Sequence, residues 1–529
     1  MIIKKYLGIL FTLSLMCSSA YGQVNPKEKF DAAFKAIKDN YVDRIDDEQM
    51  VDIAIKSILG KLDPHSKYYS REEAEKMQAS VKGSFVGIGM QFVMLGDTVY
   101  VTNVISGGPS EKCGIVSGDR ILKVNGESVS GVKMKSTDVF TKIKGEGNTS
   151  VVLSIMSQKR KISTKKVQRA AVPDRSVVTS YMVTDKTGYI LLRIFSMTTR
   201  EELDEALINL KKEGMENLIL DLQSNGGGLV ESAIGAADEF LKKDQLVYYS
   251  VGNNDQKDYY YTSGLGQFMS GRLVVLIDQY TASASEILTG ALQDWDRAVV
   301  VGRRSFGKGL MQYPLPLFDG SVLQLTKARY YTPSGRSLQK PYKNVDYNSE
   351  IIKRFASGEM QDEKHMVRND SLKYTTLVNK RTVYGGGGIT PDCYIPIDTL
   401  VYSLWTQKIS AMGFIEKVSF EYVTRNRAKL GKTYPDIISY INGFTLPENI
   451  VENVFTLAEK AGIQSDQKNR KAFSELLAVN IKARIAGFLY SGDSDDIKVR
   501  NRYDHAFVKA LDIIESSEYN KLLNENNKQ

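Results

Sequence analysis

The chain has 529 residues, too many for one compact core, so about two to four domains are expected. Apolar residues make up 42% and charged residues 25% of the sequence, proportions typical of an ordinary globular protein. The formal net charge is +8, and apart from Lys4 and Lys5 the excess is expected to be spread along the chain, which makes nucleic acid a poor candidate partner.

The first 22 residues have the layout of a secretory signal. Lys4 and Lys5 precede the apolar stretch "YLGILFTLSLM" (6–16), and the small residues "AYG" precede Gln23. The apolar stretch has about half of the roughly 20 residues that a membrane span requires. We therefore predict that residues 1–22 are removed and that the protein is exported to the periplasm of a Gram-negative-type cell.

The cysteines add one alternative to this prediction. Cys17 leaves lipidation open, although the bulky Met16 before it is unlike the small residue of a lipoprotein signal. The other two, Cys113 and Cys393, do not form a disulfide framework, and whether they pair stays undecided.

Residues 23–80 predict a helical region. The stretch "KEKFDAAFKAIKDNYV" places Phe30, Phe34 and Ile37 on one helix face, and "QMVDIAIKSILGKL" repeats the pattern. Pro64 in "LDPHSKYYS" ends it.

Residues 81–167 change to short alternating strands with glycines between them and one short helix. The phrase "GPSEKCGIVSGDRILKVNG" (108–126) resembles a PDZ domain, and Gly87, Ile88, Gly89 and Met90 match the carboxylate-binding loop of that family. The resemblance implies that backbone N–H groups of this loop bind a terminal carboxylate while the peptide adds a strand beside "IGMQF".

Residues 168–400 alternate between strands and helices, which predicts a layered α/β domain with its loops gathered at strand ends. The buried strands are expected at "GYILLRIFS" (188–196), "NLILDL" (217–222), "RLVVLID" (272–278) and "RAVVVG" (297–302). Residues 401–529 predict amphipathic helices, so the whole chain is expected to be a multidomain α+β protein.

The stretch "DQYTASASEILTGALQDW" (278–295) places Ser283 where a strand turns into a helix. Serine is a preferred helix N-cap, which is the ordinary explanation. The free N–H groups of a helix start also favour a developing negative charge, so a nucleophilic serine is the second explanation. A serine hydroxyl needs a base to react.

Histidine is an unpromising base in this chain. The three histidines, His65, His365 and His505, lie outside any Ser-His-Asp motif, and no "GxSxG" occurs. Lysine serves as the base in other serine enzymes, and Lys308 lies between two glycines in "RRSFGKGLMQ". Such an amine becomes a base when burial or a neighbouring cation lowers a pKa that is ordinarily near 10.4.

Several motifs in one order resemble the carboxy-terminal processing (tail-specific) serine protease family. They are "LDPHSKYY", "DLQSNGGG" (221–228), "TASASE", "QD" (293–294), "FGKG", "LTKARYYTPSGRSLQ" (325–339) and "GGGITPD" (386–392), over residues 30–400. The resemblance implies a crotonase-like or ClpP-like core, with Ser283 as nucleophile, Lys308 as general base and Gln312 holding the lysine amine. This chain departs from the family at Gln223 and Arg303, outside the Ser–Lys pair.

The glycines of "SNGGG" suggest how the oxyanion is bound. A glycine turn after a buried strand exposes backbone N–H groups, so Gly227 or Gly228 is expected to act with the amide of Ala284. A phosphate loop is the rival explanation, but neither GK[ST] nor G-x-G-x-x-G is present. Asp294 follows Ser283 by eleven residues, roughly 16 Å along a helix, so a structural role is predicted for it.

These features together predict an exported serine endopeptidase that captures protein carboxy-terminal tails through its PDZ domain. No cofactor is expected, and no His/Cys/Asp cluster has metal-ligand spacing. A homo-oligomeric or adaptor-bound protein is also expected, the role of residues 401–529 stays open, and so does peripheral membrane association. Two alternatives stay open: a non-catalytic peptide-binding scaffold, and an acyl-CoA enzyme of the crotonase fold.

Overall fold

The computed structural model describes residues 25–347, 349–464, 467–490 and 494–524, so the predicted signal segment and Cys17 lie outside the described residues. The chain divides into two compact units, residues 1–68 and 69–529. Within the described residues, no helix has both the length and the apolar composition needed to cross a bilayer.

The first unit consists of two helices, α2 (Pro26–Asn40) and α3 (Asp47–Leu62), and the start of the short strand β1 (Lys67–Tyr69). The side chain of Asn25 accepts the N–H of Lys27, and the Asp46 carboxylate caps α3 in the same way. The predicted helical region is therefore present. Its apolar face is exposed in this chain, since no residue of α2 is buried.

The second unit begins with a helix and a β-rich domain. Its elements are α4 (Arg71–Val81), β2 (Ser84–Gly87), β3 (Met90–Leu95), β4 (Thr98–Val104), α5 (Pro109–Lys112), β5 (Arg120–Val124), β6 (Glu127–Ser128), α6 (Ser136–Ile143), β7 (Ser150–Met156), β8 (Ile162–Gln168) and β9 (Ala170–Pro173).

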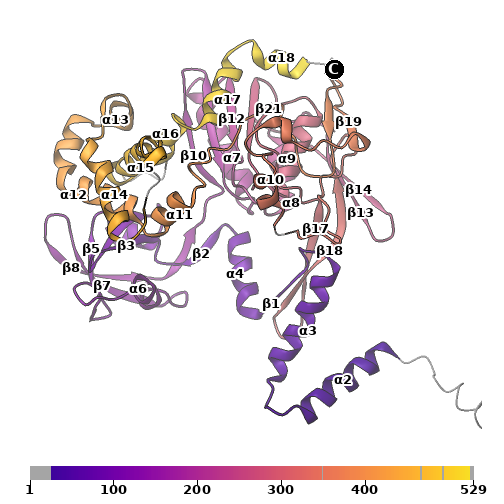
Figure 1. Cartoon of the computed structure of the whole chain (residues 1–529), viewed down its shortest axis with the longest axis horizontal. Coiled ribbons are helices and arrows are strands. Elements are labelled where there is room, and N and C mark those ends of the chain that lie inside the picture. Colours follow the sequence, from indigo (N-terminus) through magenta and orange to yellow (C-terminus); the bar gives the residue numbers. More distant parts are fainter. Residues whose placement is uncertain (1–24, 348, 465–466, 491–493, 525–529) are drawn as a thin grey trace, which may run out of the picture. The chain divides into compact units, whose positions relative to one another are not determined.

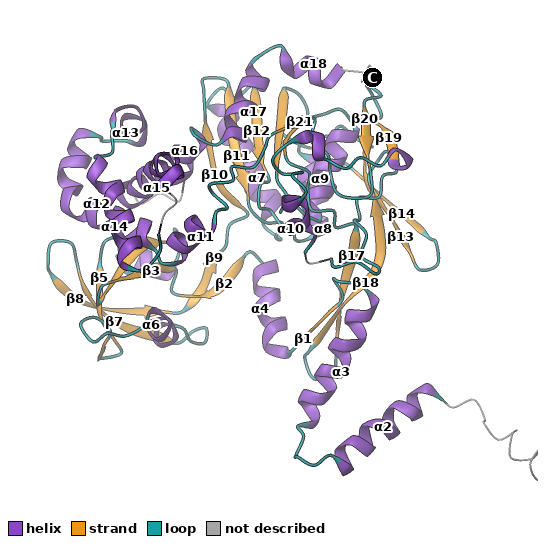
Figure 2. Cartoon of the chain, in the orientation of Figure 1, coloured by secondary structure: helices purple, strands orange, loops and turns teal. Residues whose placement is uncertain are grey.

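The β-rich domain is built on one sheet of order β3-β4-β5-β7-β8, with β6 paired to β5 (Figure 2). Alternate residues of these strands, such as Val99, Ile121 and Leu153, form its apolar core. Strand β9, which follows this sheet in the sequence, pairs back with β2.

The α/β domain follows. Its elements are β10 (Val177–Met182), β11 (Thr187–Leu192), α7 (Thr199–Lys212), β12 (Asn217–Asp221), α8 (Val230–Asp238), β13 (Leu246–Gly252), β14 (Lys257–Tyr261), β15 (Arg272–Ile277), α9 (Ala284–Asp294), β16 (Val299–Gly302), β17 (Leu310–Pro316), β18 (Val322–Tyr331), α10 (Glu350–Ala356), β19 (Lys373–Thr375), β20 (Thr382–Tyr384) and β21 (Cys393–Tyr394).

Its main sheet has the order β10-β11-β12-β15-β16-β21, parallel except for β10 (Figure 1). Both faces are buried, because successive residues of β12 alternate between two apolar clusters: Leu218 and Leu220 pack toward α7, α8 and α9, whereas Ile219 packs toward the end of the chain. A second, antiparallel sheet pairs β17, β18, β13 and β14.

The C-terminal part is helical, as predicted, and its helices pack in two separate apolar clusters. Its helices are α11 (Leu404–Ala411), α12 (Phe414–Thr433), α13 (Ile437–Gly443), α14 (Glu448–Lys460), α15 (Arg470–Tyr490), α16 (Asp495–Asn501), α17 (His505–Glu515) and α18 (Glu518–Asn524).

Helices α11 to α15 share one apolar core, whereas α17 and α18 cover the second face of the main sheet. Phe507, Ile513 and Tyr519 pack there, and the Tyr519 hydroxyl accepts the N–H of Leu273 at 3.1 Å. The main sheet needs this cover because both of its faces are apolar, so the last helices belong to the α/β domain. The predicted multidomain α+β organisation is confirmed.

Candidate functional site

Ser283 lies between the end of β15 and the start of α9, at a turn with an unusual backbone. Its φ of 59° and ψ of −117° place a serine in a region that side chains rarely adopt, and 9% of its surface is exposed. The turn is held by close packing, because a Cβ on Gly227 would lie 2.8 Å from the Ser283 Cβ and 2.9 Å from the Ala284 nitrogen. Residues with such strained backbone angles concentrate at functional sites. Here the strained turn places the Ser283 hydroxyl at the start of a helix.

Lys308 lies in the loop between β16 and β17, and its two flanking glycines are required by packing. Gly307 has φ of +86°, and a Cβ there would lie 3.0 Å from the backbone of Gly387 and Gly388. A Cβ on Gly309 would lie 2.9 Å from the nitrogen of Gln339. The glycines thus let the loop run against two other segments of the domain.

A fully buried carboxylate, Glu286, joins the serine and lysine loops. Its Oε2 accepts the backbone N–H of Ser283 and that of Lys308, each at 2.9 Å. The two amide nitrogens therefore lie within about 6 Å of each other. Its Oε1 accepts the Ser305 hydroxyl at 2.5 Å and the Gly307 N–H at 2.7 Å.

The Tyr330 hydroxyl contacts the backbone carbonyl groups of the same two residues, Ser283 and Lys308. It donates to the Lys308 carbonyl at 2.7 Å and lies 3.4 Å from the Ser283 carbonyl. Tyr330 is 1% exposed, and burial raises its pKa well above the ordinary value, so it stays a neutral donor. Ser283 and Lys308 are thus fixed to each other through both backbone ends.

Sequence reasoning missed Glu286 and Tyr330. The available signal for Glu286 was its place three residues after Ser283, which is the capping-box position of a helix. Burial raises the pKa of Glu286, while its four donors oppose that shift by favouring the charged form. All four partners donate, so the geometry suits a carboxylate acceptor at both oxygens.

Gln312, the residue predicted to hold the lysine amine, lies on β17. A bulge between Met311 and Gln312 bends the strand there. The Gln312 amide nitrogen donates to the Leu310 carbonyl at 3.1 Å and to the Thr326 hydroxyl at 3.0 Å. These bonds direct its nitrogen toward β18 and orient the amide group.

The predicted oxyanion donors do not have equal availability. The N–H of Gly227 is already donated to the Asn225 side chain at 2.9 Å. The N–H groups of Gly228 and Ala284 have no acceptor among the residues that the structure describes. Gly228 has φ of +148° and lies against the Phe195 carbonyl, so only glycine fits there. Of the three predicted donors, Gly228 and Ala284 are therefore the two whose N–H groups have no acceptor in the described part of the chain.

Asp294 lies at the far end of α9, where it forms a fully buried ion pair with Arg336 at 2.5 Å and accepts the Ser334 N–H at 2.9 Å. Replacing Asp294 by alanine leaves a buried arginine without its partner, so we expect the free energy of unfolding to fall by about 3–5 kcal/mol. The molecules of Asp294→Ala that remain folded should keep a turnover within roughly tenfold of the native value. Chemical unfolding measures the loss of stability, and turnover normalised to the number of active sites measures the activity. A stable but inactive variant would contradict the structural role.

The two arginines before the lysine loop are engaged elsewhere. Arg304 pairs with Glu359 at 2.7 Å, and its neighbour Arg303 donates to the Gln279 side chain at 2.8 Å. Arg304 therefore belongs to an ion-pair network in which Arg354 also pairs with Glu359.

In the β-rich domain, the predicted carboxylate-binding loop joins β2 to β3. The N–H groups of Ile88 and Gly89 have no backbone acceptor in the described part of the chain, and Ile88 is buried. The loop is held from the other side, because its carbonyls accept the N–H groups of Ser110 at 2.8 Å and Ile105 at 3.0 Å. Strand β3 is the end strand of its sheet, so its outer edge is open to an added strand.

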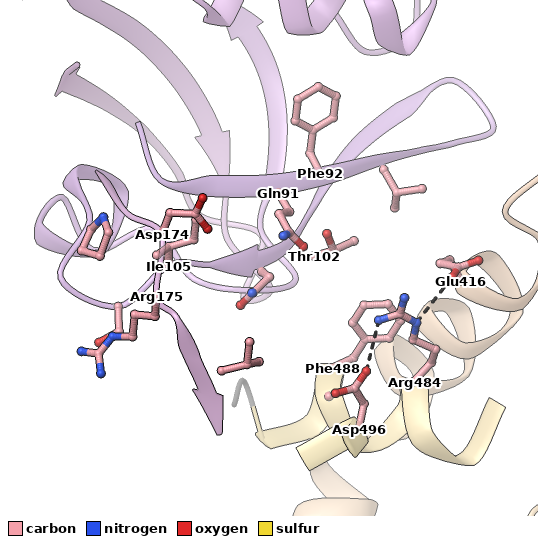
Figure 3. A pocket seen from close by; sticks show the side chains of 16 residues that line it. Gln91, Phe92, Thr102, Ile105, Asp174, Arg175, Glu416, Arg484, Phe488 and Asp496 are labelled. Atoms are coloured by element: carbon pink, nitrogen blue, oxygen red, sulfur yellow. Dashed lines mark ion pairs between the residues drawn. The ribbon is translucent and has the colours of Figure 1, made fainter. Parts of the chain in front are cut away.

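A cavity of about 680 Å³ lies between this domain and the C-terminal helices (Figure 3). Gln91 and Thr102 approach it from β3 and β4, and Arg484 approaches from α15. Arg484 pairs with Glu416 at 3.4 Å and with Asp496 at 3.5 Å. Ser283 and Lys308 are not among the residues that line this cavity, so it is separate from the site around Ser283.

Family models match four parts of the sequence. Peptidase family S41 matches residues 186–350, and a PDZ domain matches residues 100–156. The N-terminal domain of the activating protease CtpB matches residues 16–73, and a family of unknown function (DUF8443) matches residues 405–492. The predicted resemblances to a tail-specific protease and to a PDZ domain are therefore confirmed.

Whole proteins are also similar to this chain. A carboxy-terminal-processing protease of Bartonella bacilliformis is 33% identical over 339 residues, which cover 63% of this chain and 76% of the relative. The carboxy-terminal processing protease CtpB of Bacillus subtilis is 31% identical over 376 residues, covering 68% and 76%. The solved structure of a photosystem II D1 C-terminal processing protease is 28% identical over 60% of this chain and 91% of its own, with a TM-score of 0.35.

Proposed function

Because the chain belongs to the carboxy-terminal processing proteases of peptidase family S41, which are serine-type endopeptidases, we propose that it cuts proteins after capturing their carboxy-terminal tails, using a Ser283–Lys308 dyad. The observation that supports this proposal is the pair of 2.9 Å bonds from the Ser283 and Lys308 amides to one buried Glu286 oxygen.

In the proposed reaction, the uncharged Lys308 amine takes the Ser283 proton while the hydroxyl oxygen attacks a peptide carbonyl. The N–H groups of Gly228 and Ala284 bind the oxyanion that forms, and α9 adds the positive end of its dipole. The protonated lysine then supplies a proton to the leaving amine. Water, deprotonated by the same lysine, hydrolyses the acyl-enzyme.

Gln312 has a positioning role in this proposal. Its amide nitrogen is already bonded to Leu310 and Thr326, which leaves the amide oxygen as the atom suited to accept from the lysine amine. The PDZ domain would hold a terminal carboxylate at the Ile88 and Gly89 amides, with the tail along β3.

Location and assembly belong to the same proposal. We propose that residues 1–22 direct export to the periplasm and are removed before Gln23. The exposed apolar side chains of α2, such as Phe30 (51% exposed) and Ile37 (46%), suit a contact with a second copy or an adaptor.

A serine-directed acylating probe such as a fluorophosphonate tests the catalytic proposal. The native protein should be labelled on Ser283 and should cleave a protein with an apolar tail, whereas Ser283→Ala should do neither, with a loss of about 10⁴-fold or more. Ser283→Ala should still bind the tail. Intact cleavage by Ser283→Ala would remove the assignment. Tail binding without labelling of the native protein would favour the non-catalytic scaffold, and binding of acyl-CoA would favour the crotonase-type alternative.

A further inference from the structure

The net charge of the protein is concentrated in its PDZ domain. Residues 81–167 contain thirteen lysines and arginines against six acidic residues, whereas the whole chain has 70 and 62. The rest of the chain is therefore nearly balanced, with 57 and 56. The expectation that the excess is spread along the sequence is wrong, because most of it lies in this one domain.

These cations are largely unpaired. In the described residues, the ion pair of Lys142 with Glu127 at 2.7 Å is the only one made by a cation of residues 81–167. The run "KRKISTKK" (159–166) places five of the thirteen in the β7–β8 turn and in β8, with no acidic residue among them.

Strand pairing gathers several of these cations on one open face of the sheet. Lys123 lies opposite Ser154, which lies opposite Thr164, and Val152 lies opposite Lys166. Residues opposite one another, and those two positions apart, share a face. Lys123 and Lys166 therefore lie on the same exposed side of β5, β7 and β8.

We use the name basic face for this side, with Lys123 and Lys166 and the apolar Val152 and Ile162, together with the adjoining β7–β8 turn, which carries Lys159, Arg160 and Lys161. Ile162 is 59% exposed and Val152 is 37% exposed, so apolar side chains stand among the cations. With seven residues in β7 and three adjacent strands, the face measures roughly 20 by 10 Å.

Protection of a sheet edge explains only part of this pattern. Lysines on an edge strand prevent pairing with other chains, and β8 is the last strand in the order of its sheet. That role accounts for Lys166. It does not account for Lys123, which lies on the internal strand β5, or for the three cations of the turn.

We propose that the basic face docks the PDZ domain on a membrane surface rich in anionic phospholipid. Cations spread over an open sheet face match a surface of many headgroups, and Val152 and Ile162 can enter the headgroup layer while the lysine stems extend past them. The edge that would receive a peptide, β3, is at the other end of the strand order from β8. The strand that would pair with a peptide therefore contributes no residue to the basic face.

Vesicle sedimentation tests this proposal on the full chain and does not depend on catalysis. Vesicles of phosphatidylglycerol and phosphatidylcholine should bind the protein at least about tenfold more tightly than vesicles of phosphatidylcholine alone. High salt should abolish the difference, since charges on an exposed face are screened within about 3 Å at 1 M. Equal binding to the two kinds of vesicle would overturn the proposal.

Charge reversal locates the surface. Lys159→Glu with Lys161→Glu should weaken binding to anionic vesicles about twentyfold or more, since each cation near such a surface contributes roughly fivefold. Lys133→Glu with Lys135→Glu is the matched control, because it changes the net charge equally but lies before and at the start of α6. Circular dichroism checks that both variants fold.

Two outcomes of this comparison would overturn the proposal. If both double variants lose binding equally, the net charge of the domain and not the basic face is responsible. If polyglutamate binds the native protein at physiological salt, is displaced by the Lys159/Lys161 reversal, and anionic vesicles do not bind, the partner is an acidic protein segment.

Discussion

Lys308→Ala is expected to lose about 10⁴-fold or more in kcat/KM on a protein substrate, because Ser283 then has no group to take its proton. The backbone of the loop should survive the change, since the lysine N–H and carbonyl, which bond to Glu286 and Tyr330, are both retained. Tail binding by the PDZ domain should therefore remain at the native level. Steady-state cleavage and tail-binding titrations measure the two effects.

Lys308→Arg is the control that separates charge from basicity. A guanidinium keeps the positive charge but cannot act as a base in proteins, so this variant should be as inactive as Lys308→Ala. A small added amine should restore part of the activity of Lys308→Ala only. An active Lys308→Arg would show that another group is the base.

Glu286→Gln is expected to reduce turnover by about 100-fold and the free energy of unfolding by about 2–4 kcal/mol. The amide NH₂ group of glutamine must face N–H donors at one end, either those of Ser283 and Lys308 or the Gly307 N–H with the Ser305 hydroxyl. Because two hydrogen-bond donors then face each other, the bonds that hold the Ser283 and Lys308 loops together are lost. Loop displacement of about 1 Å suffices for such a loss of rate.

Glu239→Gln is the matched control for this variant. Glu239 is also a buried carboxylate of the same domain, where it accepts the Gln267 N–H at 2.8 Å, but it is not bonded to either catalytic loop. It should lower stability without lowering turnover per folded molecule. Tyr330→Phe gives a second measurement, with an expected loss of about tenfold, because it removes only the hydroxyl bond to the Lys308 carbonyl. Native turnover in both Glu286→Gln and Tyr330→Phe would show that the hydrogen bonds of Glu286 and Tyr330 do not position Ser283 and Lys308.

The sequence by itself determined the features that depend on neighbouring residues. A strand followed by small residues and a helical pattern located Ser283, and two glycines located the tight loop of Lys308. Alternating apolar patterns predicted the order of helical, β-rich, α/β and helical regions, because local periodicity decides the type of each element. The motifs around these positions were sufficient for the family resemblance.

Tertiary structure alone decided which distant groups meet. Glu286 and Lys308 are 22 residues apart, and Tyr330 and Ser283 are 47 apart, so no local pattern could pair them. Pairing of β17 with β18 decided that Gln312 lies at a bulge in a strand. Likewise, α17 and α18 from the end of the chain pack against the apolar second face of the main sheet. Burial and backbone pairing act between segments that are adjacent only in the folded chain, and for that reason they decided the parts of the site that the sequence left open.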